Sequence, residues 1–280
     1  MDTSPKLDPA SPRISRYCLL CGAGSLAVAG ALGSIRLPAL AETQAQERAI
    51  GLQVYNDLRK QNQIIDQSVY YPVLRAVGQR ISTAAQPHWW PMTFVIVKGD
   101  KANAFSVPGG WLYVNETLLK NAENEEELAS VVGHETGHIV LGHVMNRIHQ
   151  AQTANIVGGI LGLFIRNQLT ATVLNLAGNY AFLNFSRQQE YQADHEGVIL
   201  ASKANYNPWG MIWFFNRLQK LYGDVGFEQY VQDHPSTKDR IARIEGYFKS
   251  NPTAYARWSP QITASNGLRV SGAADRLILN

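Results

Sequence analysis

The chain has 280 residues, of which 45% are hydrophobic and 17% are charged, so it is long enough to bury a core. Its net charge of +3 at pH 7 is too small to favour nucleic acid or an anionic surface as a partner. The sequence shows no heptad pattern, internal repeat or low-complexity tract.

The first 41 residues have the features of a secretory signal peptide. Arg13 and Arg16 form a basic region, residues 17–33 are uncharged and rich in Ala, Leu and Gly, and small residues occupy the −3 and −1 positions of a cleavage site. We therefore predict that residues 1–41 are removed by cleavage after Ala41 and that the mature chain is secreted. In the alternative interpretation the segment stays as a membrane anchor, although its apolar stretch is at the short limit for a spanning helix.

Both cysteines of the chain, Cys18 and Cys21, lie in this N-terminal segment. Cleavage would leave a mature chain without a thiol or a disulfide, and its stability would come from a hydrophobic core or a bound metal. Cys21 is a poor match to a lipoprotein acceptor, because Leu20 precedes it where a small residue is expected.

The apolar spacing of the mature chain predicts two helices and then short strands. Residues 42–65 and 70–84 carry apolar side chains at helical intervals, so we predict an amphipathic helix over each range. Residues 92–97 are a compact β-branched run that predicts a strand. Residues 103–114 predict a strand, a tight turn at residues 108–110 and a second strand.

This hairpin has two interpretations. It fills out a small sheet, or its exposed edge strand holds an extended peptide through main-chain hydrogen bonds. Such bonds bind a peptide backbone regardless of its side chains.

Residues 125–149 contain the pattern His134-Glu135-Thr136-Gly137-His138 within a predicted helix. Asn124 is the predicted N-cap, and Glu127 completes a capping box. Two histidines four residues apart lie on one face of a helix, so both imidazoles can bind one metal ion. Glu135 follows the first of them and can take a proton from a metal-bound water.

Residues 156–165 and 169–185 are strongly apolar. The first run has about ten residues, too few to span a bilayer, so we interpret this stretch as buried core helix. The alternative is a hairpin that lies on a membrane surface or covers a cleft.

A further helix is predicted from Ser186, and it places Glu190 and Asp194 on one face. A zinc site with two histidines needs a third protein ligand and an open position for water. Glu190 can supply that ligand, and Asp194 can accept a hydrogen bond from the far nitrogen of a ligating imidazole. The alternative interpretation is that these two acids only form a solvated surface of the helix. The neighbouring His195 points about 100° away from Asp194 around the helix axis.

Two more helices are predicted over residues 208–221 and 236–248. His234 lies on a loop just before the second of them, next to Pro235. Residues 251–280 have a mixed composition and stay unassigned. Together these elements predict an α+β, mostly helical fold.

Four motifs occur in this order: N-A-F-S-V-P-G-G at residues 103–110, H-E-T-G-H at 134–138, E-Y-Q-A-D at 190–194 and H-P-S-T-K-D-R at 234–240. In this combination the chain resembles the zinc metallopeptidase family of the CAAX prenyl protease, the HtpX heat-shock protease and the BepA-like secreted bacterial proteases. The resemblance covers about residues 42–247. The membrane-spanning frame of the first two and the C-terminal repeat domain of the last have no counterpart in it, so a single-domain secreted member is expected.

The resemblance implies a gluzincin-type metalloprotease domain over residues 42–250, with a small sheet or hairpin beside the motif helix and one bound zinc ion. The residues that the family pattern assigns are His134, His138 and Glu190 as zinc ligands; Glu135, His234 and Arg240 as catalytic residues; Asp194 as the acid behind a ligand; and Asn103, Ala104, Phe105, Gly109 and Gly110 as peptide-binding residues.

Two histidines leave alternatives open. His234 is the first candidate to stabilise the oxyanion, ahead of Arg240 and a nearby tyrosine, or it would bind zinc at the open position and keep the protease latent until its loop moves. His143 lies about 140° from His138 around the axis of a continuous helix, so we predict a polar contact, with a second metal site as the alternative.

The expected function is that of a periplasmic or secreted zinc endopeptidase that cleaves unfolded or misassembled envelope proteins. No nucleic-acid partner is expected, and residues 156–185 are the candidate for peripheral membrane contact. One alternative is a zinc-bearing chaperone or adaptor that binds misfolded envelope proteins with little proteolysis, although the intact Glu135 argues against it. A membrane-associated enzyme acting on a lipidated substrate is another. The sequence indicates neither the oligomeric state nor a cleavage motif.

Overall fold

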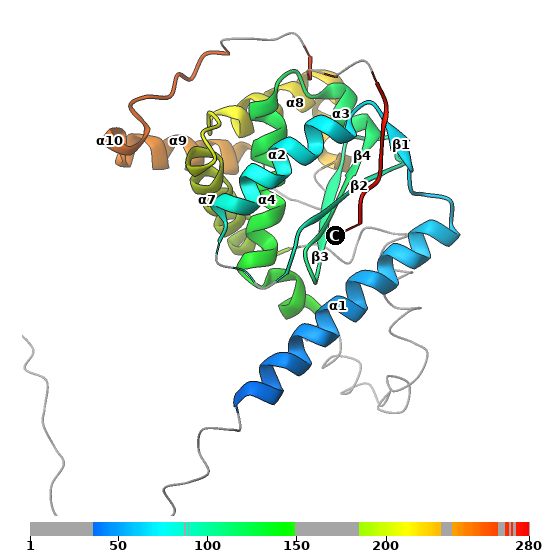
Figure 1. Cartoon of the computed structure of the whole chain (residues 1–280). Helices are drawn as coiled ribbons and strands as arrows, with labels where there is room; N and C mark the ends of the chain where they lie inside the picture. The colour runs from blue at the N-terminus through cyan, green and yellow to red at the C-terminus, as the bar shows by residue number, and fades with distance from the viewer. Residues whose placement is uncertain are drawn as a thin grey trace, which may run out of the picture. The chain divides into compact units, whose positions relative to one another are not determined.

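The elements around the H-E-T-G-H motif form a mostly helical α+β unit, as the sequence predicts (Figure 1). The computed structural model describes residues 36–86, 88, 90–148, 185–230, 237–262, 267–268, 270 and 273–279. The elements in chain order are α1 (Arg36–Lys60), β1 (Gln67–Ser68), α2 (Tyr71–Ala84), β2 (Thr93–Val97), β3 (Ala104–Val107), β4 (Trp111–Asn115), α3 (Glu116–Asn121), α4 (Glu125–Val140), α7 (Arg187–Lys203), α8 (Gly210–Tyr230), α9 (Thr237–Ser250), α10 (Pro252–Tyr255) and β5 (Asp275–Arg276).

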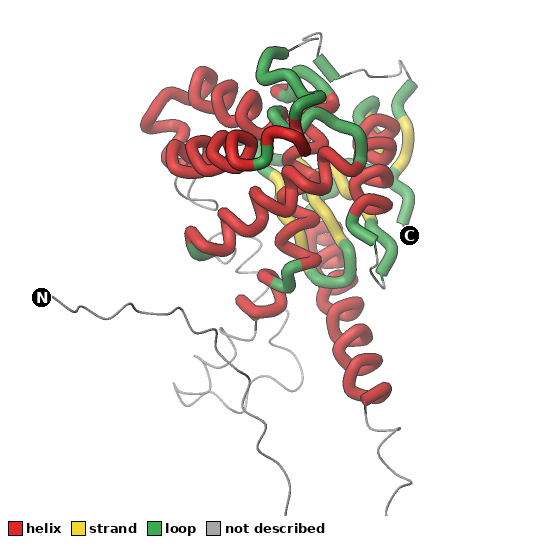
Figure 2. The backbone as a smooth tube through the Cα atoms, turned by 90° about the vertical axis from the view of Figure 1, so that its left-hand side faces the viewer, coloured by secondary structure: helices red, strands yellow, loops and turns green. Residues whose placement is uncertain are grey.

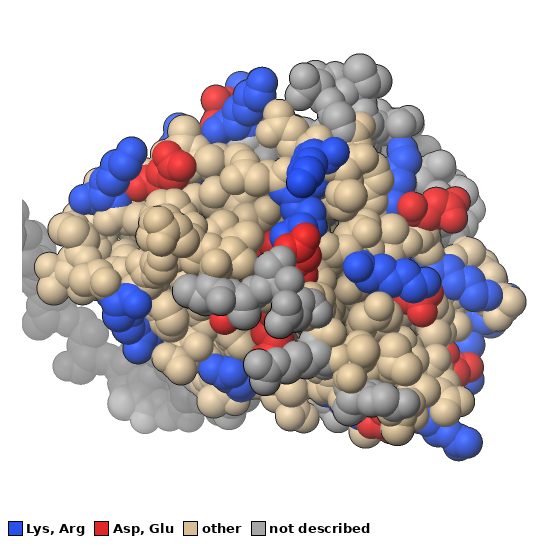
Figure 3. Space-filling view, turned by 90° about the horizontal axis from the view of Figure 1, so that it is seen from above, with Lys and Arg blue, Asp and Glu red and all other residues tan. Residues whose placement is uncertain are grey.

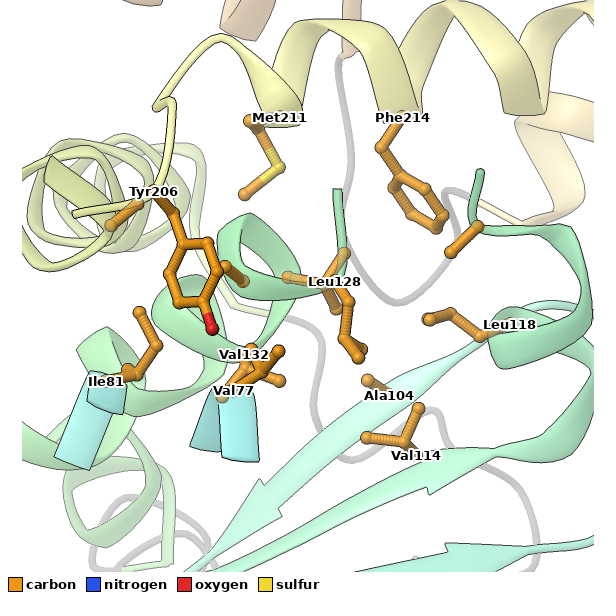
Figure 4. Packing of buried hydrophobic residues seen from close by; sticks show 14 of the residues in the cluster. Val77, Ile81, Ala104, Val114, Leu118, Leu128, Val132, Tyr206, Met211 and Phe214 are labelled. Atoms are coloured by element: carbon orange, nitrogen blue, oxygen red, sulfur yellow. The ribbon is translucent and has the colours of Figure 1, made fainter. Parts of the chain in front are cut away.

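Helix α4 lies at the centre of this unit, with α2, α7 and α8 packed around it and β3 against one side (Figure 1). Figure 2 shows from the side that helices lie on either side of the strands. Leu128 and Val132 of α4 belong to the same buried cluster as Val77 of α2 and Phe214 of α8 (Figure 4). A helix buried on all sides is held rigidly by its neighbours, so side chains on α4 have fixed positions.

Side-chain caps fix the start of α4 and α7, the two helices that carry the proposed metal ligands. Asn124 Oδ1 accepts a hydrogen bond from the backbone nitrogen of Glu127 at 2.8 Å, so the predicted N-cap is confirmed. The sequence predicts that the Glu127 carboxylate completes a capping box with Asn124; it accepts instead from the backbone nitrogen of Glu123 at 2.9 Å and from Arg217 of α8 at 2.8 Å. At α7 the capping box is complete, between Ser186 and Gln189.

The sheet has the strand order β2-β4-β3, with β2 parallel and β3 antiparallel to β4, so the predicted hairpin is confirmed. Gly109 and Gly110 form its turn with φ angles of 79° and 84°, which glycine adopts without a steric penalty. β3 is the outer strand of this sheet. All four of its residues are nevertheless buried, and α4 packs against them, so the side chains of this strand are not exposed as one of the two interpretations of the hairpin supposed.

Two helices end earlier than the sequence predicts. α1 ends at Lys60 rather than near residue 65, because Asn62 takes a φ of 56° and Ile64 then forms a β-bridge with Val97. α4 ends at Val140 rather than at residue 149, because Gly142 takes a φ of 70°. In each case one residue in the left-handed region breaks the helical path.

Helix α8 instead begins at Gly210, two residues after its predicted start, and continues to Tyr230, well beyond the predicted end at residue 221. Gly223 and Gly226 lie inside it, and each glycine in a helix costs only about 1 kcal/mol. α9 agrees with its prediction to within two residues at either end.

The described parts of residues 251–280 pack onto the domain. β5 pairs antiparallel with β1, and Asp275 of β5 binds Arg75 of α2. Leu268 is buried in the main hydrophobic cluster. This part of the chain, which the sequence left unassigned, therefore contributes to the core.

Among the described residues, no helix combines the length and the apolar character that crossing a bilayer requires. Residues 1–35 of the predicted signal peptide, residues 156–184 and His234 lie outside the described residues. On the face drawn in Figure 3, basic and acidic side chains are interspersed.

Candidate metal centre

Helices α4 and α7 approach each other closely enough to bring their two motifs together. A Cβ atom added to Gly197 of α7 would lie 2.9 Å from the backbone nitrogen of His134. One added to Gly137 of α4 would lie 3.1 Å from the carbonyl oxygen of Ala193. Larger residues would force the helices apart, so these glycines set the distance at which both helices share one site.

His134 and His138 of α4 and Glu190 of α7 form a buried group that could hold a metal ion. The two Nε2 atoms are 3.1 Å apart, and the Glu190 carboxylate oxygens lie 3.6 Å from His134 Nε2 and 3.5 Å from His138 Nε2. Tetrahedral zinc, with bonds of about 2.0–2.1 Å, holds its ligand atoms about 3.3 Å apart. The geometry and chemistry of this group therefore fit a zinc ion.

The far side of His134 is supported by a buried acid. Asp194 Oδ1 lies 3.0 Å from His134 Nδ1, at which distance the ring N–H donates to the carboxylate. Burial by itself would raise the pKa of Asp194, but the charge and hydrogen bonds of Arg240, together with His134, hold that pKa below its ordinary value. The ionised carboxylate fixes the His134 tautomer that turns Nε2 toward Glu190.

Arg240 of α9 lies behind this site. It donates to both oxygens of Asp194, at 2.7 and 2.6 Å, and its Nη1 is 3.0 Å from Glu190 Oε2. The guanidinium also lies 4.7 Å from the ring centre of Phe215, and the residue is only 2% exposed. These contacts with Asp194 and Glu190 suit a residue that positions the two acids, whereas the family pattern implies a catalytic role.

Glu135 is joined to the sheet by a hydrogen bond that sequence analysis missed. Ser106 Oγ of β3 donates to Glu135 Oε2 at 3.0 Å, and both residues are buried. Ser106 lies within the segment 103–110 that the family pattern places beside the cleft. Its position in that motif is the sequence feature that could have indicated a contact with Glu135.

His138 has a different support, which the sequence did not predict. Because Gly142 ends α4, the chain turns back and His143 Nδ1 comes within 3.0 Å of His138 Nδ1. The predicted separation on one continuous helix is therefore wrong, while the predicted polar contact is confirmed. Burial lowers the pKa of His143. Gln192 Oε1 lies 3.2 Å from His143 Nε2, and Phe185 stacks on His138 at 3.8 Å.

Three of the expected peptide-binding residues lie around the start of β3: Asn103 directly precedes the strand, and Ala104 and Phe105 begin it. Ala104 N donates to Asn103 Oδ1, and Asn103 N donates to Asn115 Oδ1, both at 2.9 Å. Phe105 stacks on Tyr113 with ring centres 4.8 Å apart, and it is buried. These contacts anchor the hairpin, so a structural role accounts for the side chains.

Gly109 and Gly110 lie in the hairpin turn. A Cβ atom on Gly109 would be 2.9 Å from the carbonyl oxygen of Glu47, and one on Gly110 would be 2.5 Å from that of Pro91. Close packing together with positive φ angles therefore explains both glycines. The part of the motif that contacts Glu135 is Ser106.

Comparison with known proteins gives a consistent picture. The model of Peptidase family M48 matches residues 71–247, more than half of the chain. The mitochondrial metalloendopeptidase OMA1 of Arabidopsis thaliana is 34% identical over 147 residues, which are 52% of this chain and 29% of that protein. A putative beta-barrel assembly-enhancing protease of Vibrio cholerae is 26% identical over 246 residues, covering 82% of this chain and 51% of the relative.

The metalloprotease LoiP of Escherichia coli is 30% identical over 162 residues, which are 55% of this chain and 62% of LoiP. The chain thus spans less than two thirds of the length of each of these relatives.

Proposed function

The chain belongs to peptidase family M48, and on that premise we propose that it is a zinc-dependent endopeptidase that cleaves unfolded or misassembled proteins of the bacterial envelope. The observation that carries the proposal is the convergence of His134, His138 and Glu190 at the spacing of a tetrahedral zinc site. Glu135 lies on the same buried helix as the two histidines, directly after His134.

One of these residues would transfer protons in the reaction, and the others would hold the reacting groups and the metal ligands in position. A bound zinc ion would supply an activated water and polarise a peptide carbonyl. Glu135 would accept a proton from this water and return it to the leaving amine. Ser106 would hold the Glu135 carboxylate in place, while Asp194 and Arg240 would fix the ligands from behind.

An extended polypeptide is the substrate that suits the sheet beside this site. β3 pairs with β4 on one side, and no other strand in the described part of the chain pairs with its second side. A peptide could add there through main-chain hydrogen bonds, which only an unfolded segment can offer. Because the residues of β3 are buried, this binding mode also requires the site to open.

The proposed location in the envelope rests on two observations. Residues 1–41 have the features of a signal peptide. Relatives in Vibrio cholerae and Escherichia coli are named beta-barrel assembly-enhancing proteases. The Arabidopsis relative is named as a mitochondrial enzyme, so membership of the family does not by itself indicate the compartment.

The test is casein degradation by the purified protein, with the zinc content measured on the same sample. Glu135→Gln should keep about one zinc ion per chain and lose at least about 10²-fold in activity, because the base is gone while the ligands remain. Glu126→Gln, the same change on the same helix, is the matched control and should keep both properties.

Two results would contradict the proposal. A wild-type protein without zinc would remove its basis. A wild-type protein that binds zinc but cuts nothing would favour the chaperone or adaptor, or a latent enzyme. His234→Ala separates these two, since it should release activity only in a latent protease.

A further inference from the structure

The two imidazoles of the proposed zinc site have unlike partners on their far sides. His134 Nδ1 lies 3.0 Å from a carboxylate oxygen of Asp194. His138 Nδ1 lies 3.0 Å from the Nδ1 of a second imidazole, His143, and His143 Nε2 lies 3.2 Å from the amide oxygen of Gln192. The H-E-x-x-H pattern includes neither His143 nor Gln192.

The order of these contacts fixes where the protons lie. Two imidazole nitrogens form a hydrogen bond only when one carries a proton and the other a lone pair. An amide oxygen accepts, so Gln192 selects the form of His143 that is protonated on Nε2. The His143 Nδ1 lone pair then accepts from Nδ1–H of His138, which leaves the His138 Nε2 lone pair on the side of Glu190.

A turn of the backbone and the close packing of two helices bring these side chains together. Gly142, with a φ of 70°, turns the chain so that His143 lies against His138. His143 is only 4% exposed there. The close approach of Ala193 to Gly137 brings α7 alongside, and Gln192 precedes Ala193. Gln192 itself is an exposed residue, so its side chain contributes little to the core.

We propose that Gln192 and His143 are positioning residues that fix the Nδ1–H tautomer of His138 and so prepare its Nε2 for zinc. The inference rests on the proposed zinc site and extends it. His143 contacts Nδ1 of His138, the ring nitrogen that points away from Glu190. It therefore supports the proposed ligand rather than binding the same ion.

The experiment compares Gln192→Leu, which removes the acceptor, with Gln192→Glu, which keeps it. Zinc affinity is measured by competition with a chromophoric chelator. Gln192→Leu should bind zinc about tenfold more weakly, as loss of an outer-shell partner usually does, while Gln192→Glu should remain close to wild type. Gln188→Leu, another exposed glutamine of α7, is the matched control and should leave the affinity unchanged.

A second readout does not depend on zinc. Long-range ¹⁵N NMR reports the ring tautomers of metal-free and zinc-loaded protein. Wild type should show His143 protonated on Nε2 and His138 protonated on Nδ1, and Gln192→Leu should show a mixture of His143 tautomers.

Wild-type zinc affinity and wild-type tautomers in Gln192→Leu would overturn the inference. So would unchanged zinc affinity in a folded His143→Ala variant. If the wild-type protein binds no zinc, the proposed function fails on its own, and the tautomers of the metal-free protein decide whether Gln192 and His143 control His138.

Discussion

At the scale of single residues, Ser106 is expected to affect catalysis through its hydrogen bond to Glu135. Its hydroxyl donates to Glu135 at 3.0 Å, and hydrogen bonds to charged groups contribute about 1.5–3 kcal/mol. We expect Ser106→Ala to lower kcat about tenfold with a smaller effect on KM, because the bond orients the base rather than the substrate. Steady-state kinetics on a fluorogenic peptide measures both.

Ser130→Ala is the matched control for this prediction. Ser130 is also buried, lies on α4, and its hydroxyl has no hydrogen-bond partner within the described part of the chain. Its removal should leave kcat unchanged. Equal losses in the two variants would show that a buried serine on either element matters only for packing.

Tyr71 shows how one buried hydroxyl makes stability depend on pH. Its O–H donates to the carbonyl oxygen of Ile65 at 2.7 Å and accepts from Ile96 N at 3.1 Å. Burial raises the pKa of Tyr71 from 10.0 to about 12. The unfolded chain therefore ionises at lower pH than the folded one, so this stabilisation is complete below pH 10 and is lost as the pH rises toward 12.

We expect the free energy of unfolding to fall as the pH rises above about 10, and to fall less in Tyr71→Phe. At about pH 8 this variant should be less stable by about 1–2 kcal/mol, because two backbone groups lose their partner. Urea unfolding across this pH range measures both effects. Tyr70→Phe should follow the wild-type profile; an equally steep alkaline loss in Tyr71→Phe would contradict the assignment to Tyr71.

At the scale of helices, the site depends on how closely α4 and α7 pack. A Cβ atom on Gly197 would lie 2.9 Å from His134 N and 3.1 Å from its Cα, so α7 would have to move. We expect Gly197→Ala to cost about 1–3 kcal/mol in stability. It should also weaken zinc binding about tenfold, since Glu190 moves with α7 while the histidines stay on α4.

Gly246→Ala in α9 is the control for this prediction, because nothing lies within 4 Å of the added Cβ atom. Alanine should there raise stability by about 0.5–1 kcal/mol through its helix propensity and leave zinc binding unchanged. Thermal melting and chelator competition on both variants give the comparison. Wild-type zinc affinity in Gly197→Ala would mean that the helix spacing does not set the site.

At the scale of the whole molecule, a zinc ion would tie together two helices that are distant in sequence. Ligand at 100 times its dissociation constant stabilises by about 2.7 kcal/mol, which corresponds to a Tm shift of about 5–10 °C for a domain of this size. We expect chelation to lower Tm by that amount and added zinc to restore it. Glu135→Gln should show the same shift, because Glu135 is not a proposed ligand; an unchanged Tm after chelation would contradict a zinc site.

The C-terminal part of the chain also contributes to the folded unit. Leu268 is 7% exposed in the main cluster, whereas Ile278 is 51% exposed. Leu268→Ala should therefore lower the free energy of unfolding by about 2 kcal/mol or more, and Ile278→Ala should change it by less than about 0.5 kcal/mol. Urea unfolding of the two variants tests this; equal effects would mean that Leu268 does not belong to the core.

The sequence by itself determined the features that depend on neighbours along the chain. The periodicity of residues 71–84, the N-cap at Asn124 and the turn glycines Gly109 and Gly110 all act within a few residues, so these elements could be predicted. The same holds for the i, i+4 spacing of His134 and His138, which lies within one helix.

The tertiary structure decided which distant residues meet. The hydrogen bond between Ser106 and Glu135 depends on how β3 packs against α4, and the support of His138 depends on the turn at Gly142. No local pattern fixes these contacts, because each joins side chains whose separation is set by packing between elements rather than by distance along the chain. The meeting of His134, His138 and Glu190, the proposed zinc ligands, is of this kind, since Glu190 reaches the histidines only where glycines let two helices approach.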